Sequence, residues 1–349
     1  MLARLETAFY WTAHQIGITR LSSARYRRRA AILMYHGVTD RAGNGIGPSK
    51  HVPQSLFRRQ MAYLASHCHV VPLDQLVSQI ERGCISQPHT VAITFDDGYR
   101  NTYTQAFPIL RAFQLPATVF LITGYVGARR ALRGDRLVYA LERTERRALS
   151  LDDRDLPLQT RRQRRQAYEQ VAQRLRRLDE DHRDQLADHV VRQLEHELAQ
   201  EQAGGDWSFL TWDQIIEMAR GGISFGAHTE NHVILTQTDP QRAASEVMRS
   251  KQAIEARLGQ ETALFAYPAG HPGDYDEVTK RILEQAGLRG AVLARTGFAR
   301  ATDHPLSLSR VGVSGEESYW HFVASVSGLR QPLSLIKKAV ARRLLDMTS

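Results

Sequence analysis

Thr94-Phe95-Asp96-Asp97-Gly98 places two adjacent carboxylates directly after the apolar run Val91-Ala92-Ile93. That run continues into Thr94 and Phe95 and is typical of a buried strand. Two carboxylates at the end of a buried strand are costly to ionise unless a positive charge compensates them. A metal ion bound by one Asp would do so, and the neighbouring Asp could then stay ionised as a base. The alternative for this motif alone is a solvent-exposed Asp-Asp-Gly turn.

A second polar cluster, His228-Thr229-Glu230-Asn231-His232, also follows a strand-like segment, Ile223–Ala227. If this turn is helical, histidines at positions i and i+4 face the same way. A single His-x-x-x-His pattern often arises by chance. Together with an Asp at another strand end, it predicts an Asp-His-His set with open coordination positions, as a catalytic metal site requires.

With both motifs in this order, the sequence resembles the polysaccharide deacetylases of the NodB-homology class, which are like carbohydrate esterase family 4. That family carries T-F-D-D-G as its first motif and H-[ST]-x-x-H as its second. The resemblance extends from about Ile32 to about Val313, with one interruption. It implies that Asp96 is the general base and that Asp97, His228 and His232 hold one divalent metal ion. We expect Zn²⁺, with Co²⁺, Ni²⁺ or Fe²⁺ as alternatives.

Two further motifs of the family are altered in this sequence. The third, usually R-x-P-x-G, is Ala266-Tyr267-Pro268-Ala269-Gly270, so Ala266 replaces the arginine that normally orients the catalytic Asp. The fifth, usually L-x-H, is Leu308-Ser309-Arg310, so Arg310 replaces the histidine that acts as general acid. One explanation is loss of activity. The other is relocation of both roles, with Arg310 holding Asp96.

The relocated general acid is expected to be His36, which ends the first strand in Met34-Tyr35-His36-Gly37. This placement resembles the strand-end histidine of the biofilm poly-N-acetylglucosamine deacetylases, which look like circular permutations of the commoner family pattern. The alternative for His36 is a structural role. His271 and His304 are weaker candidates because both lie in predicted loops.

Strand-like and helix-like segments alternate along the chain, which predicts an α/β fold whose parallel sheet is covered on both faces. The candidate site residues follow strand C-terminal ends, where barrel enzymes keep their active sites. The alternation alone fits an open sheet equally well. The family resemblance implies a distorted (β/α) barrel of about seven parallel strands. The expected strands are Ala31–Tyr35, His69–Leu73, Val91–Phe95, Pro116–Ile122, Ile223–Ala227, Ala263–Tyr267, Gly290–Ala294 and Leu306–Val313.

The barrel is expected to comprise residues 31–128 and 207–328, interrupted by a helical insertion at residues 129–206. The insertion is rich in Arg, Glu, Asp and Gln, and its leucines and valines recur at helical spacing. We interpret it as a solvated helical decoration. The alternative is a lid beside the substrate groove.

Residues 1–30 and 329–349 are expected to form basic amphipathic helices. One face of the first carries Leu2, Leu5, Phe9 and Ile16, ahead of a basic cluster from Arg20 to Arg29. The second carries Leu333, Ile336, Val340, Leu344 and Met347, flanked by Lys337, Lys338, Arg342 and Arg343. Both patterns suit peripheral contact with an anionic membrane. The alternative is that both helices pack on the barrel.

Composition narrows the class of protein further. A chain of 349 residues, 42% of them hydrophobic, can bury a sizeable core, and no apolar run is long enough to span a bilayer. The net charge of +9 would suit nucleic acid, but no basic motif is interleaved with aromatic residues, so we expect no nucleic-acid partner. We recognise no export signal, so Cys68 and Cys84 are expected to be reduced. The expected location is cytoplasmic, at the inner face of the membrane if the terminal helices bind lipid.

The resemblance implies metal-dependent hydrolysis of the N-acetyl group of an N-acetylhexosamine, with release of acetate. The substrate would be an exopolysaccharide or a lipid-linked glycan precursor. The alternatives are a deformylase, a chitin or peptidoglycan deacetylase of the same fold, and a non-catalytic carbohydrate-binding protein. A complete set of candidate ligands argues against the last, because sugar binding alone needs no metal. Further residues expected at the substrate or the oxyanion are Tyr99, Tyr267, Pro268 and Ala269.

Overall fold

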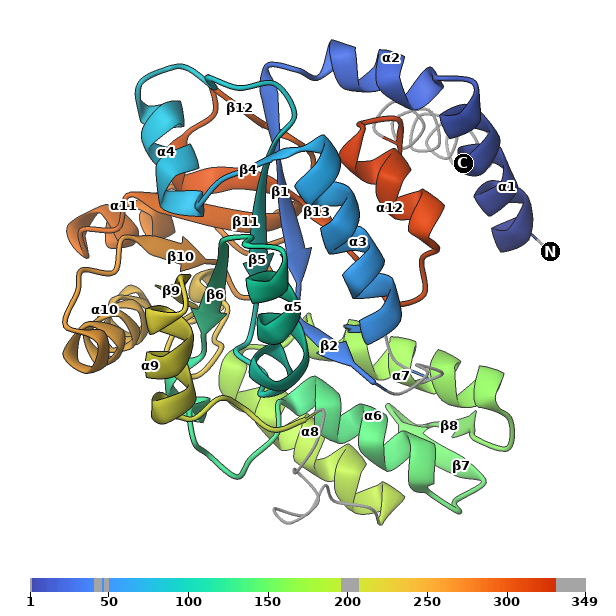
Figure 1. Ribbon diagram of the computed structural model, residues 1–349. Coiled ribbons are helices and arrows are strands. Elements are labelled where there is room, and N and C mark those ends of the chain that lie inside the picture. Colours follow the sequence, from blue (N-terminus) through green and yellow to red (C-terminus); the bar gives the residue numbers. More distant parts are fainter. Residues whose placement is uncertain (1, 41–45, 47–49, 196–206, 331–349) are drawn as a thin grey trace, which may run out of the picture.

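A closed ring of parallel strands forms the centre of the protein (Figure 1). The computed structural model describes residues 2–40, 46, 50–195 and 207–330. Within these residues, seven strands pair in the order β1-β5-β6-β9-β10-β11-β13, and β13 pairs again with β1. The predicted (β/α) barrel is therefore confirmed. The strand bounds are β1 (Arg29–Tyr35), β5 (Thr90–Phe95), β6 (Ala117–Leu121), β9 (Ile223–Ala227), β10 (Leu264–Ala266), β11 (Gly290–Thr296) and β13 (Leu308–Gly312).

Four of the expected strands are shorter than the sequence suggested: β6 and β10 each lack one residue at either end, and the other two are shortened by a neighbouring helix or turn. The strand expected over His69–Leu73 is only β4 (His69–Val70), because Pro72 has no N–H to donate and helix α4 (Leu73–Glu81) begins directly after it. The strand expected over Leu306–Val313 begins at Leu308, because Pro305–Ser307 forms a 3₁₀ turn. β4 extends the sheet beside β5, and β12 (Ala299–Arg300) runs antiparallel beside the start of β1.

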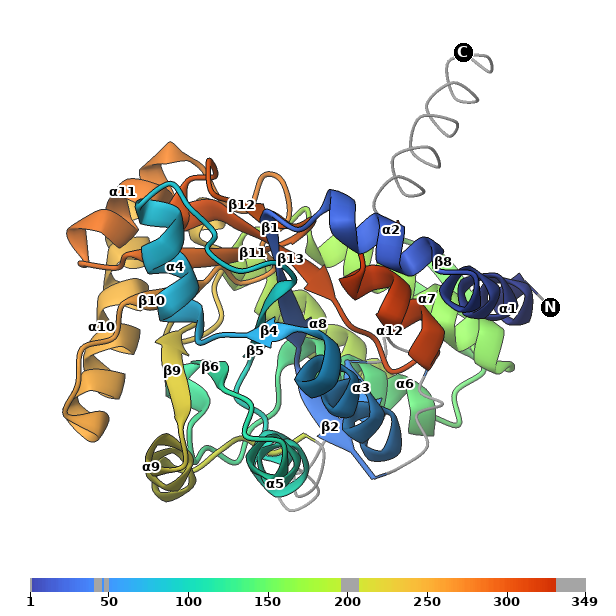
Figure 2. The same cartoon turned by 45° about the horizontal axis from the view of Figure 1, so that its top comes forward.

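Alternate residues of the barrel strands belong to two different cores, as the pleat of a strand requires. One core includes Leu33, Ile93 and Val119 and packs under the surrounding helices. The other includes Ile32 and Ala92, on the opposite face of the strands and therefore toward the barrel interior, where residues of α4 join it. The surrounding helices, several of them seen end-on in Figure 2, are α3 (Gln54–His67), α5 (Phe107–Ala112), α9 (Trp212–Arg220), α10 (Pro240–Leu258) and α11 (Glu277–Gln285).

The insertion after β6 has an apolar core of its own. The sequence predicted helices here, but not the two-stranded antiparallel hairpin that lies between the first and second of them. Arg164 ties the unit together, because its guanidinium donates to the carbonyls of Leu141, Glu142 and Thr144, at the end of the first helix. The elements are α6 (Arg133–Arg143), β7 (Ala148–Leu151), β8 (Arg154–Pro157), α7 (Arg161–Leu175) and α8 (Glu180–Leu194).

The first helices of the chain lie beside the last described one (Figure 1). Helix α1 (Leu2–Gln15) packs on α12 (Tyr319–Val326), and α2 (Ile18–Arg25) leads into β1. In the described part of the chain, no helix has both the length and the hydrophobicity to cross a bilayer. The helix expected over residues 329–349 falls almost wholly outside the described residues. Cys68 and Cys84 are both free.

A glycine in β9 should be required for the packing of the barrel interior. Gly226 faces Phe120 across the β6–β9 pair, and a Cβ at this position would lie 2.6 Å from the Phe120 ring. We expect Gly226→Ala to lower the free energy of unfolding by about 1–3 kcal/mol through overpacking. Urea unfolding measures the change.

The matched control is Gly134→Ala in α6, where the nearest atom to a new Cβ is 3.9 Å away. An alanine in a helix is favoured over glycine by about 0.5–1 kcal/mol, so this variant should be as stable as the native protein or more so. Equal stability of the two variants would show that the interior tolerates a side chain at Gly226.

Candidate active site

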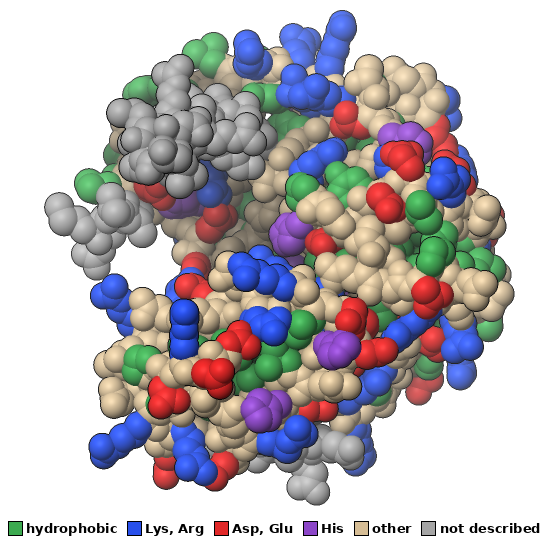
Figure 3. All heavy atoms as spheres, turned by 180° about the vertical axis from the view of Figure 1, so that it is seen from behind, with side chains coloured by type: hydrophobic (Ala, Val, Ile, Leu, Met, Phe, Trp, Pro, Cys, Tyr) green, Lys and Arg blue, Asp and Glu red, His purple; other side chains and the backbone are tan. Residues whose placement is uncertain are grey.

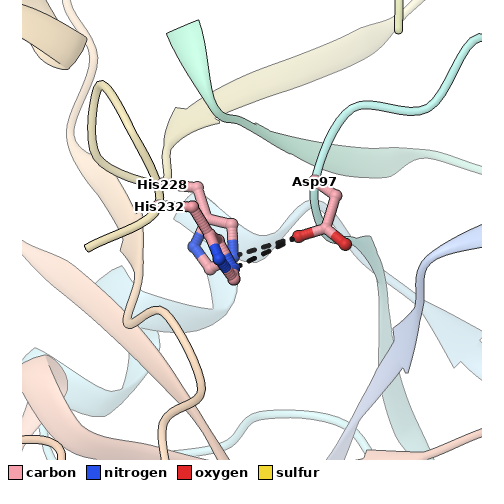
Figure 4. Close-up of side chains that lie close together, drawn as sticks. All are labelled: Asp97, His228 and His232. Carbon is pink, nitrogen blue, oxygen red and sulfur yellow. Dashed lines mark ion pairs between the residues drawn. The ribbon is translucent and has the colours of Figure 1, made fainter. Parts of the chain in front are cut away.

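Three candidate metal ligands come together at the C-terminal ends of β5 and β9 (Figure 4). The Nε2 atoms of His228 and His232 each lie 3.5 Å from Oδ1 of Asp97. One ligand atom from each of the three residues lies within 4.8 Å of the others. The two motifs singled out in the sequence therefore form one cluster.

The loop that carries the two histidines is not the helical turn that the sequence suggested. Thr229 and His232 both take left-handed backbone conformations, each with φ of 62°, and these turns bring the imidazoles together. Glu246 of α10 braces the loop: the backbone N–H and the side-chain amide of Asn231 donate to its carboxylate, at 2.8 and 2.9 Å. Sequence reasoning missed Glu246, because nothing in its own helix distinguishes it from a surface acid.

The surroundings of the two imidazoles suit metal binding. Nδ1 of His228 lies 2.6 Å from the carbonyl oxygen of Ala266, which can only accept, so Nδ1 carries the proton and Nε2 presents its lone pair toward Asp97. Burial lowers the pKa of His232 to about 3, so this ring is neutral at ordinary pH. Two histidines and a carboxylate are the donor set of many catalytic zinc sites, so the residues present fit the expected ion.

Asp96 makes a bidentate ion pair with Arg310 inside the barrel. The two guanidinium N–H groups donate to the two carboxylate oxygens at 2.7 and 2.6 Å, and Arg310 is 1% exposed. A third donor of the same guanidinium binds the carbonyl of Leu293 at 2.9 Å. Burial opposes ionisation of Asp96, but the charge and hydrogen bonds of Arg310 outweigh it, so the pKa of Asp96 lies below its usual value. Arg310 is thus placed to hold Asp96, as predicted.

Asp97 has a positively charged neighbour, Lys50, that the sequence did not indicate. Burial raises the pKa of Asp97, but the positive charge of Lys50, whose Nζ lies 3.6 Å from Oδ2, holds that pKa well below its usual value. Asp97 itself has a φ of 71°, so the chain turns sharply just after β5. Its carboxylate lies between Lys50 and the two histidines. Lys50 precedes a short strand and follows no recognisable motif, so no local signal pointed to it.

Lys50 also connects the site to the insertion through Asp135 of α6. Its Nζ lies 3.6 Å from Oδ1 of Asp135, and the hydroxyl of Tyr99 donates to Oδ2 of the same carboxylate at 2.6 Å. Asp135 is 1% exposed. The Tyr99 hydroxyl is therefore bound to a protein carboxylate, and the predicted contact of Tyr99 with substrate stays a prediction.

A cavity of about 410 Å³ opens beside the site, between the barrel and the insertion. His36 and Lys50 line it from the barrel side, and Arg165, Tyr168 and Glu169 line it from α7. In Figure 3 the surface is hollowed on the side where these two parts meet. The interpretation of the insertion as a solvated decoration is therefore wrong in part, because one of its helices forms a wall of the cavity.

The altered third motif forms a tight turn after β10. Ala269 has a φ of 61°, and the N–H of Gly270 donates to the carbonyl of Pro268 at 2.7 Å. The hydroxyl of Tyr267 is buried and donates to the carbonyl of Leu306 at 3.1 Å, so it points into the protein. The predicted substrate and oxyanion roles of these residues stay predictions.

Comparison with known sequences agrees with this geometry. The family model named Polysaccharide deacetylase matches residues 85–291, more than half of the chain. The Bacillus subtilis protein YxkH, named for the same family, is 24% identical over 300 residues, which is 86% of this chain and 76% of that protein. The poly-beta-1,6-N-acetyl-D-glucosamine N-deacetylase of Staphylococcus aureus is 38% identical over 77 residues, only 22% of this chain and 26% of that protein.

Solved structures share the fold. The deacetylase PplD of Streptococcus pyogenes superposes with a TM-score of 0.57 at 21% identity, covering 85% of this chain and 98% of that one. IcaB of Ammonifex degensii gives a TM-score of 0.55 at 20% identity, covering 86% and 97%. The family match, the barrel and the Asp-His-His cluster agree, and the chain belongs to the polysaccharide deacetylase family.

Proposed function

We propose that this protein is a metal-dependent N-deacetylase that hydrolyses the N-acetyl group of an N-acetylhexosamine in an exopolysaccharide or a lipid-linked glycan precursor. The observation that carries the proposal is the juxtaposition of two units: the Asp97-His228-His232 cluster and the Asp96–Arg310 ion pair on the neighbouring residue. The name of the Staphylococcus aureus relative supports a glycan of N-acetylglucosamine as the substrate class.

Asp97, His228 and His232 would hold the metal ion. A bound divalent cation would polarise the acetyl carbonyl and make water more acidic at neutral pH. Asp96 is kept ionised by Arg310, so it accepts a proton from the attacking water. Its two carboxylate oxygens are fixed by the guanidinium, so the base is oriented before substrate arrives.

His36 is the proposed donor of a proton to the leaving amine. Burial lowers its pKa, and although the carboxylates of Asp97 and Asp96 act in the opposite direction, the net pKa is below the usual value. The imidazole is therefore neutral before the reaction. The proton that Asp96 takes from the attacking water would pass to His36 and from there to the amine nitrogen as the C–N bond breaks, giving acetate and a free amino sugar.

Acetate release from N-acetylglucosamine oligosaccharides tests this function. We expect prolonged chelation to abolish release and added Zn²⁺ to restore it, because a bound cation would supply the polarisation of the acetyl carbonyl and the acidification of water that the reaction needs. His228→Ala should lose both the metal and the activity, whereas His271→Ala, a change in an exposed loop, should keep both.

The substrate panel should include β-1,6-linked N-acetylglucosamine, chitin oligosaccharides, peptidoglycan fragments, N-formylated sugars and lipid-linked N-acetylhexosamine. Release of formate alone would favour the deformylase alternative. Binding of these glycans without release of any acid from metal-loaded protein would show a non-catalytic carbohydrate-binding protein and exclude the proposed activity.

The two proposed proton-transfer residues should be needed for turnover but not for metal. Asp96→Asn and His36→Ala should each lower kcat by about 10²-fold or more while the bound metal, measured by elemental analysis, stays near one per chain. Metal content separates this outcome from collapse of the site. Near-normal rates in either variant would contradict the role assigned to that residue.

Loss of Arg310 should move the acid limb of the pH–rate profile to higher pH. In the native protein the lowered pKa keeps Asp96 ionised, and kcat/KM falls only as pH drops through that low value. In Arg310→Gln, burial would raise the pKa with less to oppose it, so the fall should begin at higher pH. Arg295→Gln, which removes an arginine bound to Ser309 on the next strand, is the matched control and should leave the acid limb in place.

A further inference from the structure

In the part of the chain that the structure describes, exposed large hydrophobic side chains gather in the first two helices and the turn between them. Among the described residues, seven large hydrophobic side chains are exposed, and all but Val278 lie between Leu5 and Leu21. Leu21 is 73% exposed and Ile16 67% exposed. The others are Leu5, Phe9, Trp11 and Ile18. Soluble surfaces scatter such residues singly, so six within one short segment indicate an interaction site.

The opposite side of α1 already has its partner. Tyr10 and Ala13 are buried, and the Tyr10 ring meets the His321 ring of α12 edge to face, with centroids 4.9 Å apart. The Thr7 hydroxyl donates to the Ser318 hydroxyl at 3.2 Å. Packing on the barrel is therefore satisfied by one side of the helix, and it does not explain the apolar residues on the other.

The exposed apolar residues, which we call the α1–α2 face, are bordered by arginines. Residues 1–39 contain six arginines and one acidic residue, Glu6, whose carboxylate lies 3.3 Å from His321. The exposed arginines of this region include Arg20, Arg25, Arg27 and Arg28. In Figure 3, Lys and Arg side chains gather along the upper edge of the molecule, where α2 lies in Figure 1.

We propose that the α1–α2 face binds the surface of an anionic lipid bilayer. Apolar side chains would enter the interface while the arginines pair with phosphate and other acidic headgroups, as in amphipathic helices that lie in the membrane plane. A second copy of the chain fits less well, because two such faces would bring arginines of like charge together. Residues 331–349 carry four further Lys or Arg residues and one Asp, so they share the charge sign of this face.

The α1–α2 face lies close to the cavity beside the site. What this means for substrate rests on the proposed function, whereas lipid binding does not depend on that function. The start of α1 contacts Ser318, and Ser314 and Glu316, a few residues earlier, line the cavity beside the site. A bilayer held at α1 would therefore lie near one rim of the cavity. A glycan attached to a lipid would meet the site without leaving the membrane surface.

Co-sedimentation of the full chain with vesicles tests the proposal. The protein should bind vesicles of phosphatidylcholine mixed with phosphatidylglycerol, bind vesicles of phosphatidylcholine alone much less, and dissociate as salt rises. The double variant Leu5→Gln and Phe9→Gln should lower the partition coefficient by about tenfold or more, since each substitution removes an apolar side chain that would be buried in the lipid. Arg27→Gln with Arg28→Gln should lower it by about tenfold or more for anionic vesicles.

The matched control is Val278→Gln with Arg281→Gln, an exposed apolar and basic pair on α11, which should bind as the native chain does. Trp11 gives a second measurement: its emission should shift to the blue on anionic vesicles, and Trp11→Phe should remove the shift. Circular dichroism checks that each variant is folded.

Three results would overturn the proposal. The first is an intact chain that ignores anionic vesicles at low salt. The second is binding that appears only after residues 331–349 are deleted, which would show that this segment covers the face. The third is a dimer that the Leu5 and Phe9 substitutions dissociate, with no vesicle binding, which would assign the face to a second copy. Acetate release from soluble oligosaccharides, measured in parallel, separates any of these from failure of the proposed function.

Discussion

The buried ion pair between Asp96 and Arg310 is the constraint on which the rest of the site depends. A carboxylate in the barrel interior would be protonated without a compensating charge, and removing one partner of such a pair costs about 3–5 kcal/mol. Asp96 follows β5, Arg310 lies in β13, and the two strands flank β1. The guanidinium also binds a carbonyl of β11. One side chain therefore orients Asp96, the proposed base, and joins strands on both sides of the point where the barrel closes.

The candidate site residues that the sequence indicates each depend on a local pattern. Asp96, Asp97 and His228 directly follow strands, and strand ends of a parallel barrel meet at one face. Arg310 was identifiable because it replaces a residue of a family motif. Lys50 and Asp135 were missed because their importance arises from contacts between distant segments, and a local pattern carries no information about such contacts. The same applies to the histidine loop, where i, i+4 spacing suggested a helix but left-handed turns give the observed arrangement.

The barrel and the insertion contribute different parts of the site. The barrel supplies every group proposed to act on the amide, whereas α7 supplies a wall of the cavity. Asp135 joins the two, because it is buried between Tyr99, which follows the first motif, and Lys50. A change of substrate during evolution could therefore occur in the insertion while the reacting groups stay in place. The apolar core of the insertion makes such changes structurally tolerable.

The pairing of β1 with β13 also governs how the chain can fold as it is synthesised. Leu33 of the first barrel strand is opposite Val311 of the last one, so the ring cannot close until the last strand has been made. Contacts this distant in sequence form slowly. Until then the growing sheet presents an open edge at β1, which invites pairing with other chains. Among the described residues, the buried core of the insertion takes only Ile46 from outside residues 129–206, and Ile46 is synthesised before the insertion, so this unit can assemble while the barrel is still open on the ribosome.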